Sequence, residues 1–243
     1  MKMMTFAFRN TKEILRDPLN LAFGLGFPLV LIILLSAIQA SIPVSLFEIA
    51  HLAPGICVFG LSFITLFSAT LVSRDRGSAL LQRLYTTPMR PTDFILGYTL
   101  PIIPISVAQG IVTYVAAICL GLEFSVNILY SLLFIIPISL LYIALGLLFG
   151  SVLNDKQVGG ICGALLTNVS AWLSGIWFDL ELVGGVFKDI AYALPFVHAV
   201  ELERALISGN MNGAVTNILV VLGYAIAVTA LAVFVFLRQM KKN

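Results

Sequence analysis

The sequence predicts an all-α integral membrane protein, because its composition and six long apolar runs both require lipid as the main solvent. Of the 243 residues, 60% are hydrophobic and 11% are charged, whereas soluble domains carry about 25% charged residues. Charge this sparse does not cover a soluble surface. Each uncharged run is long enough for a helix to cross a hydrocarbon layer of about 30 Å. The runs are residues 19–39, 52–73, 94–120, 127–150, 157–178 and 213–237. We expect the whole chain, 1–243, to form a single transmembrane domain.

The first run is interpreted as a retained span rather than as a cleaved signal peptide. The apolar core of a signal peptide has about 7–15 residues, and residues 19–39 exceed that length. The stretch before this run is mostly polar or amphipathic. Prolines in the third and fourth runs are compatible with membrane helices, which tolerate them with a kink.

The distribution of basic residues predicts the orientation. With a cytoplasmic N-terminus, the segments on the cytoplasmic side hold twelve of the fourteen Lys and Arg residues, and the outer segments hold only Lys188 and Arg204. The inverted topology would reverse this asymmetry and violate the positive-inside rule. We therefore expect a multi-pass protein with both termini on the cytoplasmic side.

Residues 3–17 predict a helix that lies in the membrane interface. Apolar residues recur every three or four positions, and charged residues occupy the opposite face. Pro18 favours a break before the first span. The alternative is a flank of positive charge that only directs insertion. The apolar positions are Met4, Ala7, Phe8, Thr11, Ile14 and Leu15, and the charged positions are Arg9, Lys12, Glu13 and Arg16.

The stretch "SRDRGSALLQRLYTTPMRP", residues 73–91, is a basic segment between two apolar runs. We expect it to continue the second span as a short amphipathic helix that ends at Pro88, with Thr92 as the N-cap of the next helix. The alternative is a solvated loop that only sets the topology. Such a loop has no need of an apolar stripe, which either lipid or another protein must cover. The stripe consists of Leu80, Leu81, Leu84 and Tyr85, with Arg76 and Arg83 off it.

Residues 179–212 form the long external segment. Leu182, Val186, Ile190 and Leu194 recur at four-residue spacing before Pro195, and a second helical piece follows. We therefore expect two short helices separated by that proline and partly sunk into the outer leaflet. Within the second piece, Glu201 and Arg204 are three residues apart, which is close enough to pair on a helix. His198 is interpreted as structural, since no second His or Cys lies nearby to complete a metal site.

Three motifs in order resemble the type 2 permease family of ATP-binding-cassette (ABC) exporters, the membrane subunits of bacterial drug, antibiotic and polysaccharide exporters. "SRDRGSALLQRLYTTPMRPTDFILGYTLP" is similar to the family's R-E-R-G-T-x-x-x-L-x-x-T-P segment, with Asp75 for the usual Glu and Ser78 for the usual Thr. "WLSGIWFDLE" resembles S-G-x-x-F-P, although Asp179 replaces the proline and leaves the shape of that turn open. "LPFVHAVELERAL" resembles P-L-T-H-A-V-E-x-x-R-A-L. With the six predicted spans, the resemblance extends over nearly the whole chain.

The resemblance implies a role for the two amphipathic segments. Residues 3–17 would be an elbow helix and 73–91 a coupling segment, both seated on a separate ATPase subunit, while 179–212 would be an external re-entrant pair. A charged rim around an apolar centre suits such a protein interface. The candidate coupling residues are Arg9, Arg16, Arg74, Asp75, Arg76, Gly77, Leu80, Leu81, Arg83 and Leu84, and those of the re-entrant segment are Pro195, His198, Glu201 and Arg204.

The resemblance also implies an assembly of two ATPase subunits and two permeases, the second permease identical or homologous, in a bacterial plasma membrane. The path would run between the permeases, and its lack of charge suits an amphiphilic or hydrophobic cargo such as a drug, antibiotic, peptide or lipid. The fifth span has one face of small, weakly polar residues. That face serves either simple packing or the path, since small residues allow close helix approach. The candidate path-lining residues are Ser62, Thr65, Thr167, Asn168, Ala171 and Ser174.

Other classes of function are disfavoured by what the sequence lacks. There is no G-x-x-x-x-G-K-[ST] motif, so ATP and Mg are expected on the partner ATPase and no cofactor on this chain. The six runs hold no ionisable residue for proton coupling and no His or carboxylate for an intramembrane hydrolase. The scattered cysteines lack metal-site spacing, and a net charge of +2 gives no footprint for nucleic acid. A secondary carrier or channel without ATP remains the alternative, because backbone carbonyls can hold sodium.

Overall fold

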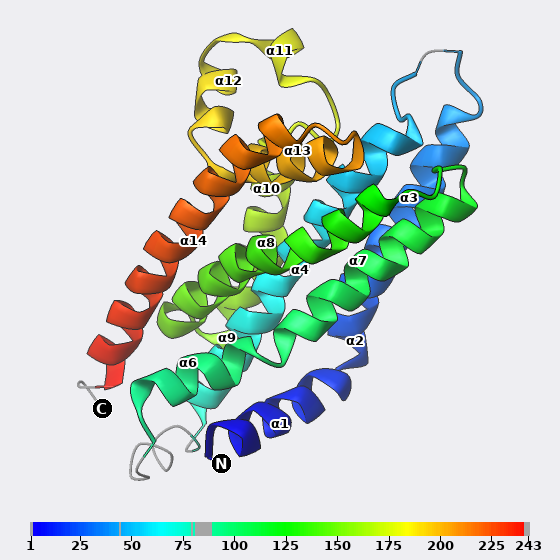
Figure 1. Ribbon diagram of the computed structural model, residues 1–243. Helices are drawn as coiled ribbons and strands as arrows, with labels where there is room; N and C mark the ends of the chain where they lie inside the picture. The colour runs from blue at the N-terminus through cyan, green and yellow to red at the C-terminus, as the bar shows by residue number, and fades with distance from the viewer. Residues whose placement is uncertain (1, 44, 79, 81–88, 241–243) are drawn as a thin grey trace.

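The computed structural model is helical throughout its described residues, which are 2–43, 45–78, 80 and 89–240 (Figure 1). Long helices run side by side, with α1 and the end of α14 at the same end of the bundle. We call this the α1 end. The elements are α1 (Lys2–Leu15), α2 (Pro18–Leu21), η1 (Ala22–Gly26), α3 (Phe27–Gln39), α4 (Ile49–Gly77), α6 (Pro91–Thr99), α7 (Ile102–Cys119), α8 (Val126–Val152), α9 (Asp155–Val158), η2 (Gly159–Leu166), α10 (Thr167–Trp172), α11 (Leu180–Val183), α12 (Gly185–Tyr192), α13 (Pro195–Ile207) and α14 (Met211–Met240).

Five helical stretches of the described chain are long and apolar enough to cross a membrane, and each covers one of the predicted spans. They are Pro18–Gln39, Ile49–Gly77, Thr92–Cys119, Val126–Val152 and Met211–Gln239. Five of the six predicted spans are thus long apolar helices, and the sixth, the predicted fifth span, has a different form. The prediction of Thr92 as a helix N-cap is wrong, since α6 begins at Pro91 and its N-cap is Arg90, whose backbone N–H donates to Asp93 Oδ2 over 2.8 Å.

The predicted fifth span, residues 157–178, is shorter and wider than a regular α-helix. It consists of α9, the π-helix η2 and α10, and it ends at Trp172. The π-helical sequence GGICGALL contains three glycines, which weaken an α-helix because they lose the most conformational entropy. The hydroxyl of Thr167 donates to the carbonyl of Cys162, five residues back, over 3.0 Å. Beyond Trp172 the chain turns, and Gly175 has a φ of 70°, which favours glycine.

Helix α4 is the centre of the molecule. Almost every residue from Leu52 to Ser73 is buried, and the helices packed around it include α3, α7, α8 and α13. Its closest neighbour is α8, where a Cβ added to Gly146 would lie 2.4 Å from Ser68 Cβ. The hydroxyls of Thr65 and Ser68 donate across this contact to the backbone carbonyls of Tyr142 and Ile143, over 2.9 and 3.2 Å. Small and hydroxyl-bearing residues thus allow the two backbones to approach, as is common between membrane helices.

The segment before the last span forms α11, α12 and α13 at the end opposite α1 (Figure 1). The predicted break at Pro195 is confirmed, with α12 before it and α13 after it. The predicted pairing of Glu201 with Arg204 does not form. Arg204 instead donates to the backbone carbonyls of His51 and Gly175, over 3.3 and 3.0 Å, and Glu201 accepts a hydrogen bond from Tyr192. Backbone carbonyls of two other segments therefore bind the guanidinium in place of the carboxylate three residues away.

Candidate functional site

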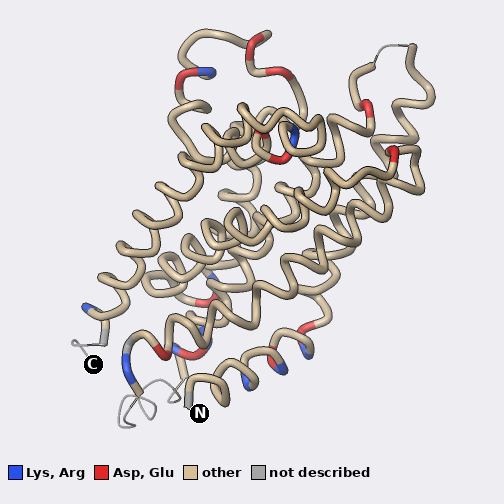
Figure 2. Tube along the Cα trace, viewed as in Figure 1, with Lys and Arg blue, Asp and Glu red and all other residues tan. Residues whose placement is uncertain are grey.

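Charged side chains gather mainly at the α1 end, where four elements meet. Figure 2 shows most of the Lys and Arg residues at this end, together with several carboxylates. Helix α1 lies across the ends of α4 and α6, and α9 begins beside the end of α4. This arrangement agrees with the basic asymmetry of the sequence, in which the segments 1–18, 73–91 and 154–156 are polar. We describe this region as the candidate site.

The buried face of α1 is aromatic and packs on α6. Phe6 meets the rings of Phe94 and Tyr98 edge to face, at centroid distances of 5.9 and 5.0 Å. Asn10 is fully buried and donates from Nδ2 to the carbonyl of Gly97 over 3.0 Å. A Cβ at Gly97 would lie 2.3 Å from Phe6, so only glycine allows this approach.

The apolar face predicted for residues 3–17 divides into two in the structure. Ala7 and Ile14 are buried against the bundle, whereas Met4, Phe8 and Leu15 are about 60% exposed. The exposed apolar residues remain available to lipid, as expected for a helix in the membrane interface. Helix α1 therefore has three sides. One packs on the protein, the second is apolar and exposed, and the third is polar.

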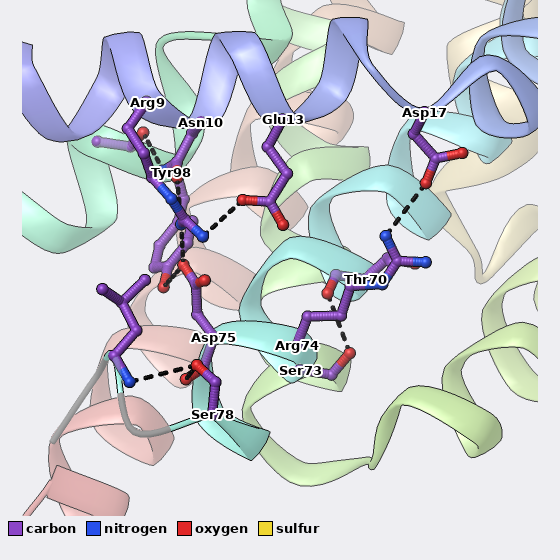
Figure 3. Close-up of polar contacts among 12 residues, drawn as sticks. Arg9, Asn10, Glu13, Asp17, Thr70, Ser73, Arg74, Asp75, Ser78 and Tyr98 are labelled. Atoms are coloured by element: carbon purple, nitrogen blue, oxygen red, sulfur yellow. Dashed lines mark hydrogen bonds and ion pairs between the residues drawn. The ribbon is translucent and has the colours of Figure 1, made fainter.

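A buried carboxylate links α1 to the end of α4 (Figure 3). Asp75 is 2% exposed, and its Oδ2 accepts from Arg9 Nη1 over 2.6 Å and from the hydroxyl of Tyr98 over 3.0 Å. Arg9 also binds Asn10 Oδ1 over 2.8 Å and Glu13 Oε2 over 2.6 Å. One cluster therefore joins α1, α4 and α6 through charge-assisted hydrogen bonds, which are stronger than neutral ones.

Ionisation within this cluster follows from burial and from neighbouring charge. Partial burial lowers the pKa of Arg9, but the hydrogen bond and the charge of Asp75 outweigh it, so the pKa of Arg9 is raised overall. Burial raises the pKa of Glu13, and the attraction of Arg9 only partly opposes this effect. Arg9 therefore stays charged, as the buried Asp75 requires.

The two other arginines at the end of α4 also bind within the chain. Arg74 lies between two carboxylates, with Nη1 3.1 Å from Asp17 Oδ2 and Nε 3.4 Å from Asp155 Oδ1. Arg76 donates to the backbone carbonyls of Gly150, Val152 and Leu153, at the end of α8, over 3.1–3.2 Å. A cation in this position satisfies the last carbonyls of a helix and complements its dipole.

Two open hollows flank Arg74 on the surface. The first has a volume of about 690 Å³, and the second, of about 710 Å³, runs along α1. Arg74 contributes to both walls, so the two hollows share one basic ridge. The first is lined by Ser73, Arg74, Arg76, Gly77, Ser78, Asn154, Asp155 and Lys156. The second is lined by Thr5, Phe8, Arg9, Lys12, Glu13, Arg16, Asp17, Pro18 and Arg74.

The structure brings together the predicted coupling residues that it describes. Arg9, Arg16, Arg74, Arg76 and Gly77 all line the two hollows. Asp75 lies beneath them and is already bound within the chain, and Leu80 is half-buried. The coupling roles of all these residues stay predictions. Leu81, Arg83 and Leu84 lie outside the described residues.

The candidate path-lining residues separate into two groups. Ser62, Thr65, Thr167, Ala171 and Ser174 are buried inside the single chain, and each hydroxyl among them donates to a backbone carbonyl. Asn168 is exposed, and its Nδ2 donates to the carbonyl of Ala164 over 2.8 Å. A path-lining role stays a prediction for the whole set, and Asn168 is the member that another subunit could reach directly.

The predicted residues of the re-entrant segment bind to neighbouring helices. His198 lies between Asn217 Oδ1, 2.8 Å from Nδ1, and the carbonyl of Tyr192, 3.1 Å from Nε2. Pro195 is buried at the start of α13. Burial lowers the pKa of Arg204 to about 10, with nearby acidic groups acting in the opposite direction. These contacts attach α13 to α12, α14 and the start of α4.

Sequence reasoning missed several members of the α1-end cluster. Tyr98 and Gly97 lie within an apolar run and gave no signal of their own. Asn10 could have been found, because it falls three residues after Ala7 and four before Ile14, on the same helical face. Asp17 and Asp155 carried no motif, and only the fold places them on either side of Arg74.

Comparison with protein families identifies this arrangement. The family model described as "ABC-2 type transporter" matches residues 1–208. The chain belongs to the ABC-2 type transporter family. Among curated proteins none matches it. The match includes residues 73–101, 172–181 and 194–206, which hold the three motifs on which the resemblance in the sequence depends.

As an ABC-2 type permease, the chain is a multi-pass membrane subunit for transport, and its sequence contains no G-x-x-x-x-G-K-[ST] motif for ATP. Membership of the family implies an ATPase partner.

Proposed function

We propose that this ABC-2 permease is the membrane subunit of a bacterial exporter that moves an amphiphilic or hydrophobic substrate outward. Energy comes from ATP hydrolysed by a separate ATPase subunit, which carries the ATP and Mg sites. The α1 end faces the cytoplasm in this proposal, in accord with the excess of basic residues in its segments. Two permeases, identical or homologous, and two ATPase subunits form the transporter, and its path runs at the seam between the permeases.

The observation that supports this proposal is the linkage of a basic surface to the central helix. Arg9 lines the hollow along α1, and the same guanidinium binds the buried Asp75 of α4. A partner that displaces α1 therefore acts on α4 through a direct ion pair of 2.6 Å. Lys12 and Arg16 are exposed on the same edge, where acidic side chains of a partner can reach them.

The test is co-purification of an ABC ATPase from the same genome, co-expressed with the tagged permease. We expect a complex that hydrolyses ATP, and we expect the double reversal Lys12→Glu, Arg16→Glu to reduce ATPase recovery at least about tenfold at low salt. The matched control is Lys188→Glu at the opposite end, which should recover the ATPase like the unmodified protein. Equal recovery of ATPase by both variants would contradict the proposed interface, and transport that persists without ATP would contradict the proposed function.

A further inference from the structure

Glu203 is a fully buried carboxyl group outside the α1-end site. It lies in α13, its side chain has no exposed surface, and α13 packs against α4, α8, α12 and α14. The side chain reaches the hydroxyls of Tyr114 in α7 and Ser131 in α8, both also buried. A buried carboxylate without a cation is strongly unfavourable, so its protonation state needs an explanation.

Three oxygen atoms at this point form a closed triangle. Tyr114 Oη is 2.8 Å from Glu203 Oε2, Ser131 Oγ is 2.6 Å from Tyr114 Oη, and Ser131 Oγ also contacts Glu203 Oε2. Each such contact requires one proton between the two oxygens, because otherwise two lone pairs face each other. The two hydroxyls supply only two protons for three contacts. The third proton belongs on Glu203, which then donates to Ser131, while Ser131 donates to Tyr114 and Tyr114 to Glu203.

The second oxygen of the carboxyl group favours the same assignment. Glu203 Oε1 is buried and has no hydrogen-bond partner among the residues that the structure describes. An unpartnered carbonyl oxygen of a neutral acid costs less to bury than an unpartnered oxygen that shares a negative charge. The ion pairs of the described residues do not include Glu203, and the adjacent Arg204 directs its guanidinium to the carbonyls of His51 and Gly175.

Among the described residues, no cation is paired with Glu203. The titratable groups that interact electrostatically with Glu203 are Cys57 of α4 and Tyr114 of α7, and a thiol and a phenol are both neutral at pH 7. The other titratable groups on the elements packed around α13 are not hydrogen-bonded to Glu203 where the structure describes them. They are His51, Arg74, Asp75 and Arg76 of α4, Tyr130 and Tyr142 of α8, Lys188, Asp189 and Tyr192 of α12, His198, Glu201 and Arg204 of α13 itself, and Tyr224 and Arg238 of α14. Of these, Arg74, Asp75 and Arg76 lie at the α1 end, where their partners are Asp17, Asp155, Arg9, Tyr98 and the carbonyls at the end of α8.

We propose that Glu203 is a proton-binding site, and that its bound proton completes the ring of hydrogen bonds that fixes α13 to α7 and α8. Burial raises the pKa of Glu203 to about 7, and the hydrogen-bonding contacts with Ser131 and Tyr114 oppose this rise. The unfolded chain has a glutamate pKa of about 4.3. The folded state therefore binds more protons between these two values. The stabilisation is complete below the lower value and is lost as the pH rises through the upper one.

Thermal unfolding of the purified full-length permease at about pH 5 and about pH 8 tests this site. We expect the unmodified protein to lose melting temperature over this rise, and Glu203→Gln to lose clearly less, because an amide keeps a donor in the ring without titrating. Glu201→Gln, two residues away and paired with Tyr192 in a half-buried contact, is the control and should behave like the unmodified protein. An unchanged pH dependence in Glu203→Gln would overturn the proposal.

Infrared spectroscopy decides the question even if Glu203→Gln does not fold. The unmodified protein should show the C=O stretching band of a protonated carboxylic acid at about pH 6, where exposed carboxyl groups are ionised. Where the variant does fold, that band should be missing from its spectrum. Absence of the band from the unmodified protein would show that Glu203 is ionised and would overturn the assignment.

Discussion

At the scale of single residues, Asp75 shows how one buried charge depends on its surroundings. Its carboxylate has two donors, Arg9 and Tyr98, which come from two other helices. Removal of one partner from a buried pair leaves the other without compensation, which costs more than the pair contributes. Arg9 is 38% exposed, so water screens part of that cost.

We predict that Asp75→Asn lowers the free energy of unfolding by about 1–3 kcal/mol, the range for a hydrogen-bonded charge that is lost from a partly screened pair. Arg74→Gln, which removes an exposed guanidinium between two carboxylates, should cost at most about 1 kcal/mol. Denaturant unfolding of both variants in detergent measures the difference. If the two variants had the same free energy of unfolding, the buried contacts of Asp75 would contribute no more to stability than the exposed contacts of Arg74.

Arg76 gives a second prediction at this scale. Because Arg76 binds three carbonyls at the end of α8, Arg76→Glu places a negative charge against the negative end of a helix dipole. We expect a loss of about 1–2 kcal/mol in stability as well as impaired export, with Arg76→Lys closer to the unmodified protein. Unfolding and export assays on the same preparations separate the two effects. Unchanged stability in Arg76→Glu would mean that the capping contacts contribute nothing.

At the scale of elements, the packing of α1 on α6 depends on the absence of a side chain at Gly97. A Cβ there would lie 2.3 Å from Phe6 Cδ1, so the two helices would have to move apart. We predict that Gly97→Ala destabilises the protein by about 1–3 kcal/mol, the usual cost of overpacking. Gly223→Ala is the matched control, because nothing lies within 4 Å of its Cβ and alanine favours a helix.

A second substitution, at Phe6, provides a further test of the contact with Gly97. Phe6→Leu should recover part of the stability lost in Gly97→Ala, because the smaller side chain makes room at the contact. Thermal unfolding of the single and double variants measures the coupling. Strict additivity of the two substitutions would mean that the clash lies elsewhere.

The small-residue face of the fifth predicted span consists of a buried part and an exposed part. Ala171 is 3% exposed, whereas Ala164 is exposed beside Asn168. We predict that Ala171→Trp prevents folding, because the core has no space for the ring, and that Ala164→Trp folds normally. If this open face adjoins a second permease, Ala164→Trp and Asn168→Leu should alter export without loss of expression. Normal export by both would mean that the path does not pass this face.

At the scale of the whole molecule, the orientation can be tested with two lysines at opposite ends. In a variant whose three cysteines are replaced, Lys188→Cys on α12 should react with a membrane-impermeant thiol reagent in intact cells. Lys156→Cys on α9 should react only after the membrane is opened. Both lysine side chains are accessible in the structure, so burial does not account for a difference. Labelling of Lys156→Cys from outside would reverse the proposed topology.

Much of this architecture could be predicted from hydropathy alone. The features that could not be predicted share one physical cause, because they depend on the choice of hydrogen-bond partners. Five spans follow from uncharged runs, since burial in lipid requires apolar length. The π-helical course of Gly159–Leu166 is a change of hydrogen-bonding pattern in a glycine-rich part of an apolar run, and hydropathy does not record such a change. Pairing was predicted from spacing along one helix, and it failed for Glu201 and Arg204 because carbonyls and hydroxyls of other helices were closer.

The candidate site was predicted in part for the same reason. Basic residues at the ends of spans mark the surface, so Arg9 and Arg74 were found from charge. The glutamate at position 203 was missed, although it shares a helical face with Phe196, Val200 and Leu206. An ionisable residue on an apolar helical face is expected to be buried. The burial of Glu203 could therefore have been predicted if α13 had been treated as a core helix and not as an external segment.

The course of α4 has a geometric consequence. The helix is held near one end by the contact of Arg204 with the carbonyl of His51, and near the other end by the contact of Arg9 with Asp75. These points are about 36 Å apart along an unbroken helix, at about 1.5 Å per residue. A tilt of only about 5° about one anchor displaces the other by about 3 Å. Because α4 is continuous between these two anchors, a small change of angle at the α1 end would become a displacement of several ångström at the opposite end of the helix.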